Sequence, residues 1–155
     1  MSGLSIGDAI PPVTLAGADG ATIDLARLKG APLVVYFYPK ADTPGCTTEA
    51  QDFTRLAPDF AHLNAQVLAV SRDAPAKLCK FRDKYGLTVR LASDEDGAVC
   101  EAFGTWVEKQ NYGRTYMGIE RSTFLFGADG KLAKVWRKVR VKGHADAVLE
   151  AAKAL

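Results

Sequence analysis

Cys46 is the residue of this chain whose surroundings best suit covalent chemistry. It ends the segment PKADTPGC, residues 39–46, which separates an apolar run from a helical pattern. We therefore expect Cys46 in the first turn of a helix, beyond the carboxyl end of a strand, where active sites of α/β proteins gather. Free backbone N–H groups and the helix dipole favour an anion there, and the thiolate is the nucleophilic form of cysteine. Position alone predicts a reactive thiol, with a packed small side chain as the alternative.

Two flanking segments must hold Cys46 in place. The run LVVYFY, residues 33–38, contains β-branched and aromatic residues without interruption, which is typical of a central strand buried on both faces. After Cys46 the apolar residues recur at three- and four-residue steps, as on one face of a helix. They are Ala50, Phe53, Ala57 and Phe60. Pro58 should kink or end this helix.

The remaining pattern alternates strands with helices. Further strands are expected at 66–72, 89–93, 122–127 and 132–139, and an N-terminal hairpin at 13–25. Helices are expected at 75–85, at 96–103 and from His144 onward, with Ala145, Val148, Leu149, Ala152 and Leu155 facing the core. The segment 108–118 has little periodicity and reads as a loop. The pattern predicts one α/β domain over residues 1–155, with a central mixed β-sheet flanked by helices.

Composition narrows the possible partners. The 155 residues carry a net charge of +2, which gives no argument for binding nucleic acid or a membrane surface. The basic stretch WRKVRVK, residues 136–142, alternates charge with valine and is explained by an edge strand with one wet face. No apolar stretch approaches the length of a membrane span, and the N-terminus lacks the pattern of a secretory signal. Three cysteines do not suggest a disulfide scaffold, so we expect a reducing compartment, the cytoplasm.

Other functional classes find less support in the residues. His62, His144 and the three cysteines show no metal-ligand spacing, and no glycine-rich nucleotide-binding motif is present, so no cofactor is expected. A disulfide reductase normally uses C-x-x-C, whereas Thr43 stands where the second cysteine would be. A single-cysteine thiol–disulfide exchanger and a purely structural protein remain as alternatives.

The segment around Cys46 resembles a known family. Pro39, Thr43 and Cys46 form Pro-x-x-x-Thr-x-x-Cys, which is similar to the peroxidatic motif of the peroxiredoxins. The longer YFYPKADTPGCTTEA, residues 36–50, resembles the peroxiredoxin Q branch, also called bacterioferritin comigratory proteins. GIERSTFLF, residues 118–126, resembles the segment that carries the family's essential arginine, here Arg121. VSRD at 70–73 and the C-terminal WRKVRVKGHADAVL also fit, so the resemblance covers nearly the whole chain.

The resemblance implies a thioredoxin-like fold and a thiol peroxidase that reduces hydrogen peroxide and organic hydroperoxides. It implies no metal, haem or flavin, and electrons supplied by thioredoxin or a similar small thiol protein. It also favours a monomer, with a dimer through a sheet edge as the alternative.

The resemblance also assigns roles in the site. Cys46 would attack one peroxide oxygen while the other leaves with negative charge. The Thr43 hydroxyl and the N–H groups at 45–46 would contact the peroxide oxygens. Arg121 would stabilise both the thiolate and the transition state, and Pro39 would wall the pocket against water. Glu49 either holds Arg121 or is a solvated helix residue.

The second cysteine of the reaction stays open at the level of sequence. One subgroup of the branch carries it five residues after the first, where this chain has Gln51. Another carries it on the helix after the VSRD-like segment, and there Cys79 is the candidate, about one turn before the expected place, which Arg82 takes. Cys100 reads as a packed residue, and an external thiol could replace both. If Cys46 and Cys79 pair, we expect one or both helix ends to unwind. Tyr38 and Trp106 either are ordinary core or edge aromatics or line the pocket as well.

Overall fold

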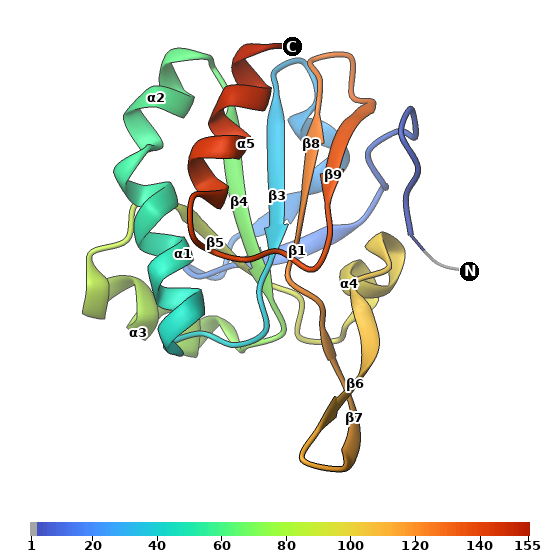
Figure 1. The fold of residues 1–155 in the computed structure, drawn as a ribbon. Coiled ribbons are helices and arrows are strands. Elements are labelled where there is room, and N and C mark those ends of the chain that lie inside the picture. The colour runs from blue at the N-terminus through green and yellow to red at the C-terminus, as the bar shows by residue number, and fades with distance from the viewer. Residues whose placement is uncertain (1–2) are drawn as a thin grey trace.

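A seven-stranded mixed sheet forms the centre of the computed structural model, which describes residues 3–155 (Figure 1). The strand order is β2-β1-β5-β4-β3-β8-β9. The strands β3, β4 and β5 run parallel, and the remaining pairs are antiparallel. The bounds are β1 Thr14–Gly17, β2 Thr22–Asp24, β3 Leu33–Phe37, β4 Gln66–Ser71, β5 Arg90–Ser93, β8 Ser122–Phe126 and β9 Leu132–Trp136. The N-terminal hairpin and the mixed sheet expected from the sequence are confirmed.

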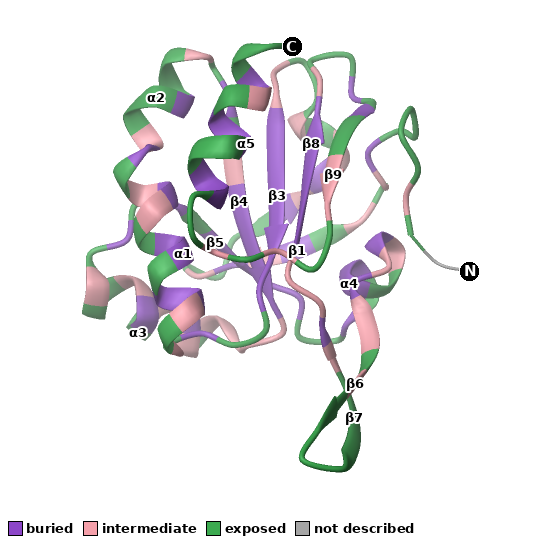
Figure 2. Ribbon diagram, viewed as in Figure 1, coloured by how far each residue is buried: buried purple, intermediate pink, exposed green. Residues whose placement is uncertain are grey.

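Strand β3 is buried along its whole length, as its unbroken apolar run predicts (Figure 2). It pairs with β4 on one side and β8 on the other. Because side chains alternate along a strand, Val34 and Tyr36 enter one core while Val35 and Phe37 enter the other. Its carboxyl end leads directly into the segment that contains Cys46.

The helices divide between the two faces of the sheet. The first core packs against β3 from the helices on one face, which are α1 Pro44–Arg55, α2 Ala57–His62, α3 Pro75–Tyr85 and α5 His144–Lys153. The second core is covered by α4 Ala98–Phe103 and by a short 3-10 turn at Leu25–Leu28. In the part of the chain that the structure describes, no helix is long and apolar enough to cross a bilayer.

Pro58 interrupts the helix after Cys46, as the sequence predicts. The break falls at Leu56, which has φ −90° and ψ 0°, and Pro58 stands in the first turn of α2. Proline lacks the N–H that would continue the helix, but a first turn has no intrahelical use for that group. Phe53 and Phe60 still reach one core, with ring centroids 5.9 Å apart.

The prediction of a loop at 108–118 is wrong. This segment forms a two-stranded antiparallel hairpin, β6 Trp106–Asn111 and β7 Arg114–Ile119, which projects from the sheet (Figure 1). Most of its residues face solvent on both sides (Figure 2), so burial imposes no apolar alternation on the sequence. The turn places Tyr112 and Gly113 at φ 51° and 76°, in the left-handed region. Because tyrosine is not a typical residue for this conformation, the sequence does not indicate the turn.

Two expectations near the C-terminus are also corrected. The strand expected at 132–139 ends at Trp136, so residues 137–142 are not an edge strand. Lys138 has φ 49°, which takes the chain out of the extended conformation, and the N–H of Val139 donates to the Arg121 carbonyl at 3.0 Å. Leu155, expected in the core, is 54% exposed because α5 ends before it.

Candidate active site

Cys46 lies in the first turn of α1, beyond the carboxyl end of β3, as the sequence predicts. Thr43 is the N-cap residue and Pro44 begins the helix. The side chain of Cys46 is nearly buried, with 2% of the residue exposed. The first N–H groups of a helix have no intrahelical acceptors, so those of Gly45 and Cys46 are available for an anion beside the sulfur.

Arg121 comes from the short connection between β7 and β8 and points at Cys46. Its Nη2 donates to the Cys46 sulfur at 3.3 Å, and its Nη1 donates to Glu49 Oε1 at 2.6 Å. A Cβ on Gly45 would lie 3.3 Å from Arg121 Nη2, so the glycine leaves room for the guanidinium. The structure therefore brings the predicted cysteine and arginine into contact from segments far apart in the sequence.

Glu49 stands one turn after Cys46 and is almost completely buried. Of its two interpretations, the structure supports the contact with Arg121 over the solvated helix residue. Burial raises the pKa of Glu49 to about 7, although the positive charge of Arg121 acts in the opposite direction. Its second oxygen, Oε2, is buried without a hydrogen-bond partner. Glu49 thus fixes the guanidinium at the expense of a partly unsatisfied carboxylate.

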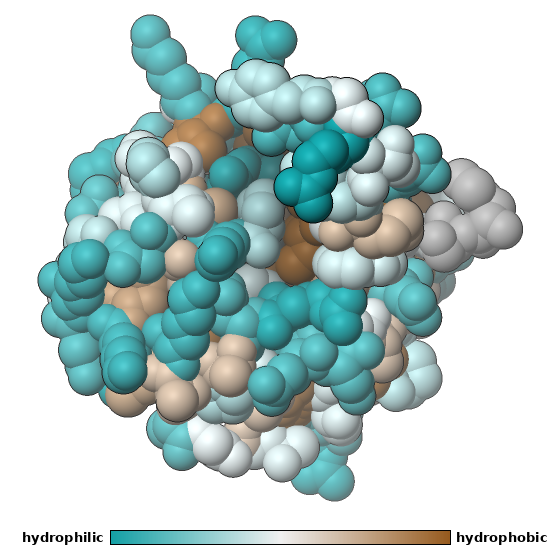
Figure 3. Space-filling model, turned by 90° about the horizontal axis from the view of Figure 1, so that it is seen from below, coloured by the Kyte–Doolittle hydropathy of each residue, from teal (hydrophilic) through white to brown (hydrophobic). Residues whose placement is uncertain are grey.

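Thr43 and Pro39 lie in the segment that connects β3 to α1. The Thr43 hydroxyl donates to the Lys40 carbonyl at 2.8 Å. Pro39 is exposed and lines a hollow of about 510 Å³ beside the hairpin, together with Trp106 and Lys109. Burial, with the charge of Arg121 as a second cause, lowers the pKa of Lys109. Seen from this end of the molecule, the surface is mostly hydrophilic with small apolar areas (Figure 3).

Two aspartates hold the connecting segment, and sequence reasoning gave neither a role. Asp73, the last residue of VSRD, accepts hydrogen bonds from the Ala41 N–H and the Ser71 hydroxyl, both at 2.8 Å. Asp42 accepts from the Tyr85 hydroxyl at 2.5 Å and from Lys84 at 3.0 Å, which lowers its pKa. Asp42 has φ 63°, a left-handed conformation that aspartate tolerates. The contact with Tyr85 ties α3 to the segment that precedes Cys46.

The comparisons with known proteins agree with this geometry. The model of the AhpC/TSA family matches residues 6–135. The chain belongs to the AhpC/TSA family. It is 46% identical over 150 residues to peroxiredoxin Bcp of Bacillus subtilis, covering 97% of this chain and 96% of that one. It is 42% identical over 149 residues to peroxiredoxin Bcp of Escherichia coli, covering 96% of each.

Solved structures place it in the peroxiredoxin Q branch. Bacterioferritin comigratory protein of Xanthomonas campestris superposes with a TM-score of 0.89 at 45% identity, over 95% of this chain and 98% of that chain. PrxQ of Xylella fastidiosa gives a TM-score of 0.93 at 40% identity, over 99% and 98%. The expected thioredoxin-like fold is confirmed, and the chain is a peroxiredoxin, a thiol peroxidase that uses peroxides and a thiol reductant.

The three cysteines of this peroxiredoxin are free thiols. Cys79 is half-buried on α3, and its sulfur contacts Arg82 at 3.2 Å and Asp83 at 3.9 Å. Cys79 and Cys46 lie on different helices, and no disulfide joins them. Cys100 is completely buried on α4, and burial, with the Asp94 carboxylate beside it, raises the pKa of its thiol. This environment suits the packed residue that the sequence predicts.

His144 lies at the entrance of α5, as expected, and its side chain is buried. Its Nε2 is 2.7 Å from the Thr123 hydroxyl oxygen, and its ring meets Phe53 and Trp136 edge to face. Burial, with the charge of Arg121 as a second cause, lowers the pKa of His144 to about 4. The ring is therefore neutral at ordinary pH. An isolated histidine before an apolar helix carries no sequence signal for this role.

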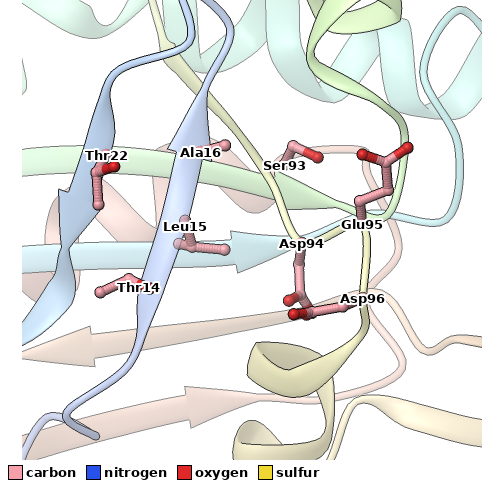
Figure 4. A pocket seen from close by; sticks show the side chains of 8 residues that line it. All are labelled: Thr14, Leu15, Ala16, Thr22, Ser93, Asp94, Glu95 and Asp96. Atoms are coloured by element: carbon pink, nitrogen blue, oxygen red, sulfur yellow. The ribbon is translucent and has the colours of Figure 1, made fainter.

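A hollow of about 500 Å³ lies away from Cys46, between β1 and the loop after β5 (Figure 4). Three acidic residues line it, but Asp94 accepts from the N–H groups of Val99 and Cys100 at 3.0 and 2.7 Å. That carboxylate therefore caps the start of α4. None of the residues that the sequence predicts for the active site lines this hollow.

Proposed function

We propose that Cys46 is the peroxidatic residue of this peroxiredoxin, acting on hydrogen peroxide and organic hydroperoxides. The observation that carries the proposal is the donation from Arg121 Nη2 to the Cys46 sulfur at 3.3 Å. The thiolate attacks one peroxide oxygen, the O–O bond breaks, and the second oxygen leaves with the electron pair and takes a proton. Cys46 is left as a sulfenic acid, and the product is water or an alcohol.

The groups around Cys46 suit this displacement. Arg121 keeps its proton at any working pH, so one guanidinium stabilises the thiolate and the charge on the departing oxygen. The N–H groups of Gly45 and Cys46 supply further donors at the start of α1. We propose that the Thr43 hydroxyl contacts the peroxide oxygens and that Pro39 forms part of the pocket wall. Supporting evidence is their position in the segment that leads into α1.

We propose Cys79 as the resolving cysteine. It is half-buried, whereas Cys100 is completely buried and its pKa is raised, which leaves little thiolate for attack. Because Cys46 and Cys79 lie on different helices, forming their disulfide requires the end of α1, of α3 or of both to unwind. Asp42 links α3 to the segment before α1 and would have to release Tyr85 or move with it. If neither residue resolves Cys46, an external thiol does.

The further context of the reaction is also part of the proposal. All electrons come from thiols, and thioredoxin or a similar small thiol protein is the reductant expected for this family. We expect a cytoplasmic monomer without a nucleic-acid partner. The bacterioferritin comigratory protein of Xanthomonas campestris has alkyl peroxide reduction activity, which supports organic hydroperoxides as substrates here.

The test is the rate at which the reduced protein consumes hydrogen peroxide, followed by stopped-flow fluorescence. Cys46→Ser should abolish the fast phase, because the attacking sulfur is gone. Cys100→Ser is the matched control and should keep the wild-type rate constant. A fast phase that survives in Cys46→Ser would overturn the assignment. So would a wild-type rate no greater than that of a small thiol in solution.

A further inference from the structure

Arg82 is bound to the sulfur that we assign to resolution. Its Nη2 donates to Cys79 Sγ at 3.2 Å, and its Nε donates to Asp83 Oδ1 at 3.2 Å. One guanidinium therefore contacts Cys79 and is oriented by Asp83, and all three residues lie on α3. We propose that Arg82 is a positioning residue for resolution, which holds the Cys79 thiolate and directs its attack on oxidised Cys46. This inference rests on the proposed role of Cys79.

The contact resembles the one at Cys46 in its chemistry. In each case an arginine that cannot lose its proton donates to a sulfur and is fixed by a carboxylate, Glu49 for Arg121 and Asp83 for Arg82. The two contacts differ in solvent exposure. The Glu49 side chain is 1% exposed, whereas the Asp83 side chain is 68% exposed. The effect of Arg82 should therefore be smaller than that of Arg121.

The step that Arg82 assists is a thiol attack on a sulfenic acid. The Cys79 thiolate attacks the Cys46 sulfur, the S–S bond forms, and the S–O bond breaks. Hydroxide leaves with the electron pair and takes a proton to become water. Cys79 is oxidised and the sulfenic sulfur is reduced, so no other oxidant is needed. Arg82 Nη2, 3.2 Å from Cys79 Sγ, holds the attacking sulfur in place for this step.

Asp83 acts in the opposite direction on the same sulfur. The Cys79 thiol is 3.9 Å from Asp83 Oδ2, to which it can donate, and a carboxylate at that place disfavours the thiolate. From neighbouring elements, Asp19 and Arg90 line the hollow of about 190 Å³ that Arg82 also lines. Arg82 carries a positive charge and contacts the Cys79 sulfur directly, so it attracts the Cys79 thiolate.

The contact of Arg82 with Cys79 depends on the helical part of α3. The two residues are three positions apart and share one helix face, so Arg82 can hold the sulfur while residues 79–82 remain helical. Asp42 holds the C-terminal end of α3 through Tyr85, and that contact does not involve Arg82. Helix α3 thus has two roles: it is tied to the segment before Cys46, and it carries the Cys79 thiol. Because different residues serve the two roles, substitutions can change one without the other.

The experiment measures disulfide formation after one equivalent of hydrogen peroxide, by rapid quench and mass. Arg82→Gln should slow this step about two- to fivefold at neutral pH. Arg82→Lys should restore part of the rate. Asp83→Asn keeps an oxygen that can accept from Arg82 Nε, so it should keep more of the rate than Arg82→Gln. Cys46 oxidation should keep its wild-type rate in all three variants.

The outcomes separate this inference from the role of Cys79. If Cys79→Ser still forms the same intramolecular disulfide at the wild-type rate, the proposed resolving residue is wrong, and with it the role of Arg82. If Cys79→Ser abolishes the disulfide while Arg82→Gln keeps the wild-type rate of disulfide formation, only the role of Arg82 is wrong. Lys80→Gln, a change of the neighbouring charge on α3, is the matched control and should leave the rate of disulfide formation unchanged.

Discussion

Arg121 reaches Cys46 across 75 residues of sequence, and its Nη2 lies 3.3 Å from the sulfur. Two features make this contact possible. Glu49 holds the other guanidinium nitrogen, Nη1, at 2.6 Å, and the missing side chain of Gly45 leaves space for Nη2. The nucleophile and its positive partner therefore meet in a nearly buried place, where their interaction is stronger than in water.

Replacing Arg121 should have a large effect on the peroxide reaction. Arg121→Lys keeps a charge but cannot contact Cys46 and Glu49 through two fixed nitrogens. By analogy with the loss of one oxyanion donor, we expect the second-order rate constant for hydrogen peroxide to fall by about 10²- to 10³-fold. Stopped-flow kinetics would measure it, with far-UV circular dichroism to verify folding. Arg114→Lys, on the exposed hairpin, should react as wild type, and a similar rate in both variants would refute the role of Arg121.

The sequence predicts the elements that are buried, because burial imposes a pattern. The run 33–38 is a central strand, and the spacing of Phe53 and Phe60 marks the helical face that packs against it. The hairpin β6–β7 was missed for the same reason, since its residues are mainly exposed and no period distinguishes them from a loop.

Contacts between distant polar residues were harder to predict than the elements. The pairing of Arg121 with Cys46 was predicted from the resemblance to a family. The spacing of residues near either position does not indicate it. The burial of His144 against Thr123 depends on how α5 docks on β8, which is decided by tertiary packing. The Arg82–Cys79 contact lies three residues apart on one helix face, a spacing that permits a contact without requiring it.

Glu49 should make stability fall as pH rises. Its pKa is raised from 4.5 to about 7 in the folded protein, so the folded state binds more protons between these values. The contribution of Glu49 to the free energy of unfolding is complete below pH 4.5 and is lost as the pH rises past 7. For this shift the loss amounts to up to about 3 kcal/mol. Glu49→Gln should lose this dependence and gain stability relative to wild type as pH rises. Urea unfolding at about pH 4.5 and 8 would measure the difference, and an equal difference at both values would contradict it.

His144 should have the opposite effect on the acid side. Its pKa is lowered from 6.5 to about 4, so the unfolded state binds more protons between these values. The contribution of His144 to the free energy of unfolding is complete above pH 6.5 and is lost as the pH falls toward 4. The loss amounts to up to about 3 kcal/mol. His144→Gln, which keeps a polar group for Thr123, should flatten this loss. His62→Gln on the exposed end of α2 is the control, and the account fails if both variants unfold with the same pH dependence.

The turn of the β6–β7 hairpin should become more stable with a residue that accepts its geometry. Tyr112 is held at φ 51°, which is unfavourable for most side chains but accessible to asparagine. Tyr112→Asn should stabilise the hairpin by about 0.5–1 kcal/mol and slow amide hydrogen exchange along β6 and β7 accordingly. Tyr116→Asn makes the same change at an exposed strand residue and should not slow exchange. Faster exchange in Tyr112→Asn would contradict the expected relief of strain.

The most direct test of the mechanism is the mass of the reduced protein after one equivalent of hydrogen peroxide, followed by a non-reducing peptide map. The account predicts a loss of about 2 Da and a peptide that joins Cys46 to Cys79. A gain of about 16 Da on Cys46 alone would contradict resolution by Cys79 and leave the peroxidatic role standing. Cys46 recovered unmodified, after the peroxide has been consumed, would contradict the central claim.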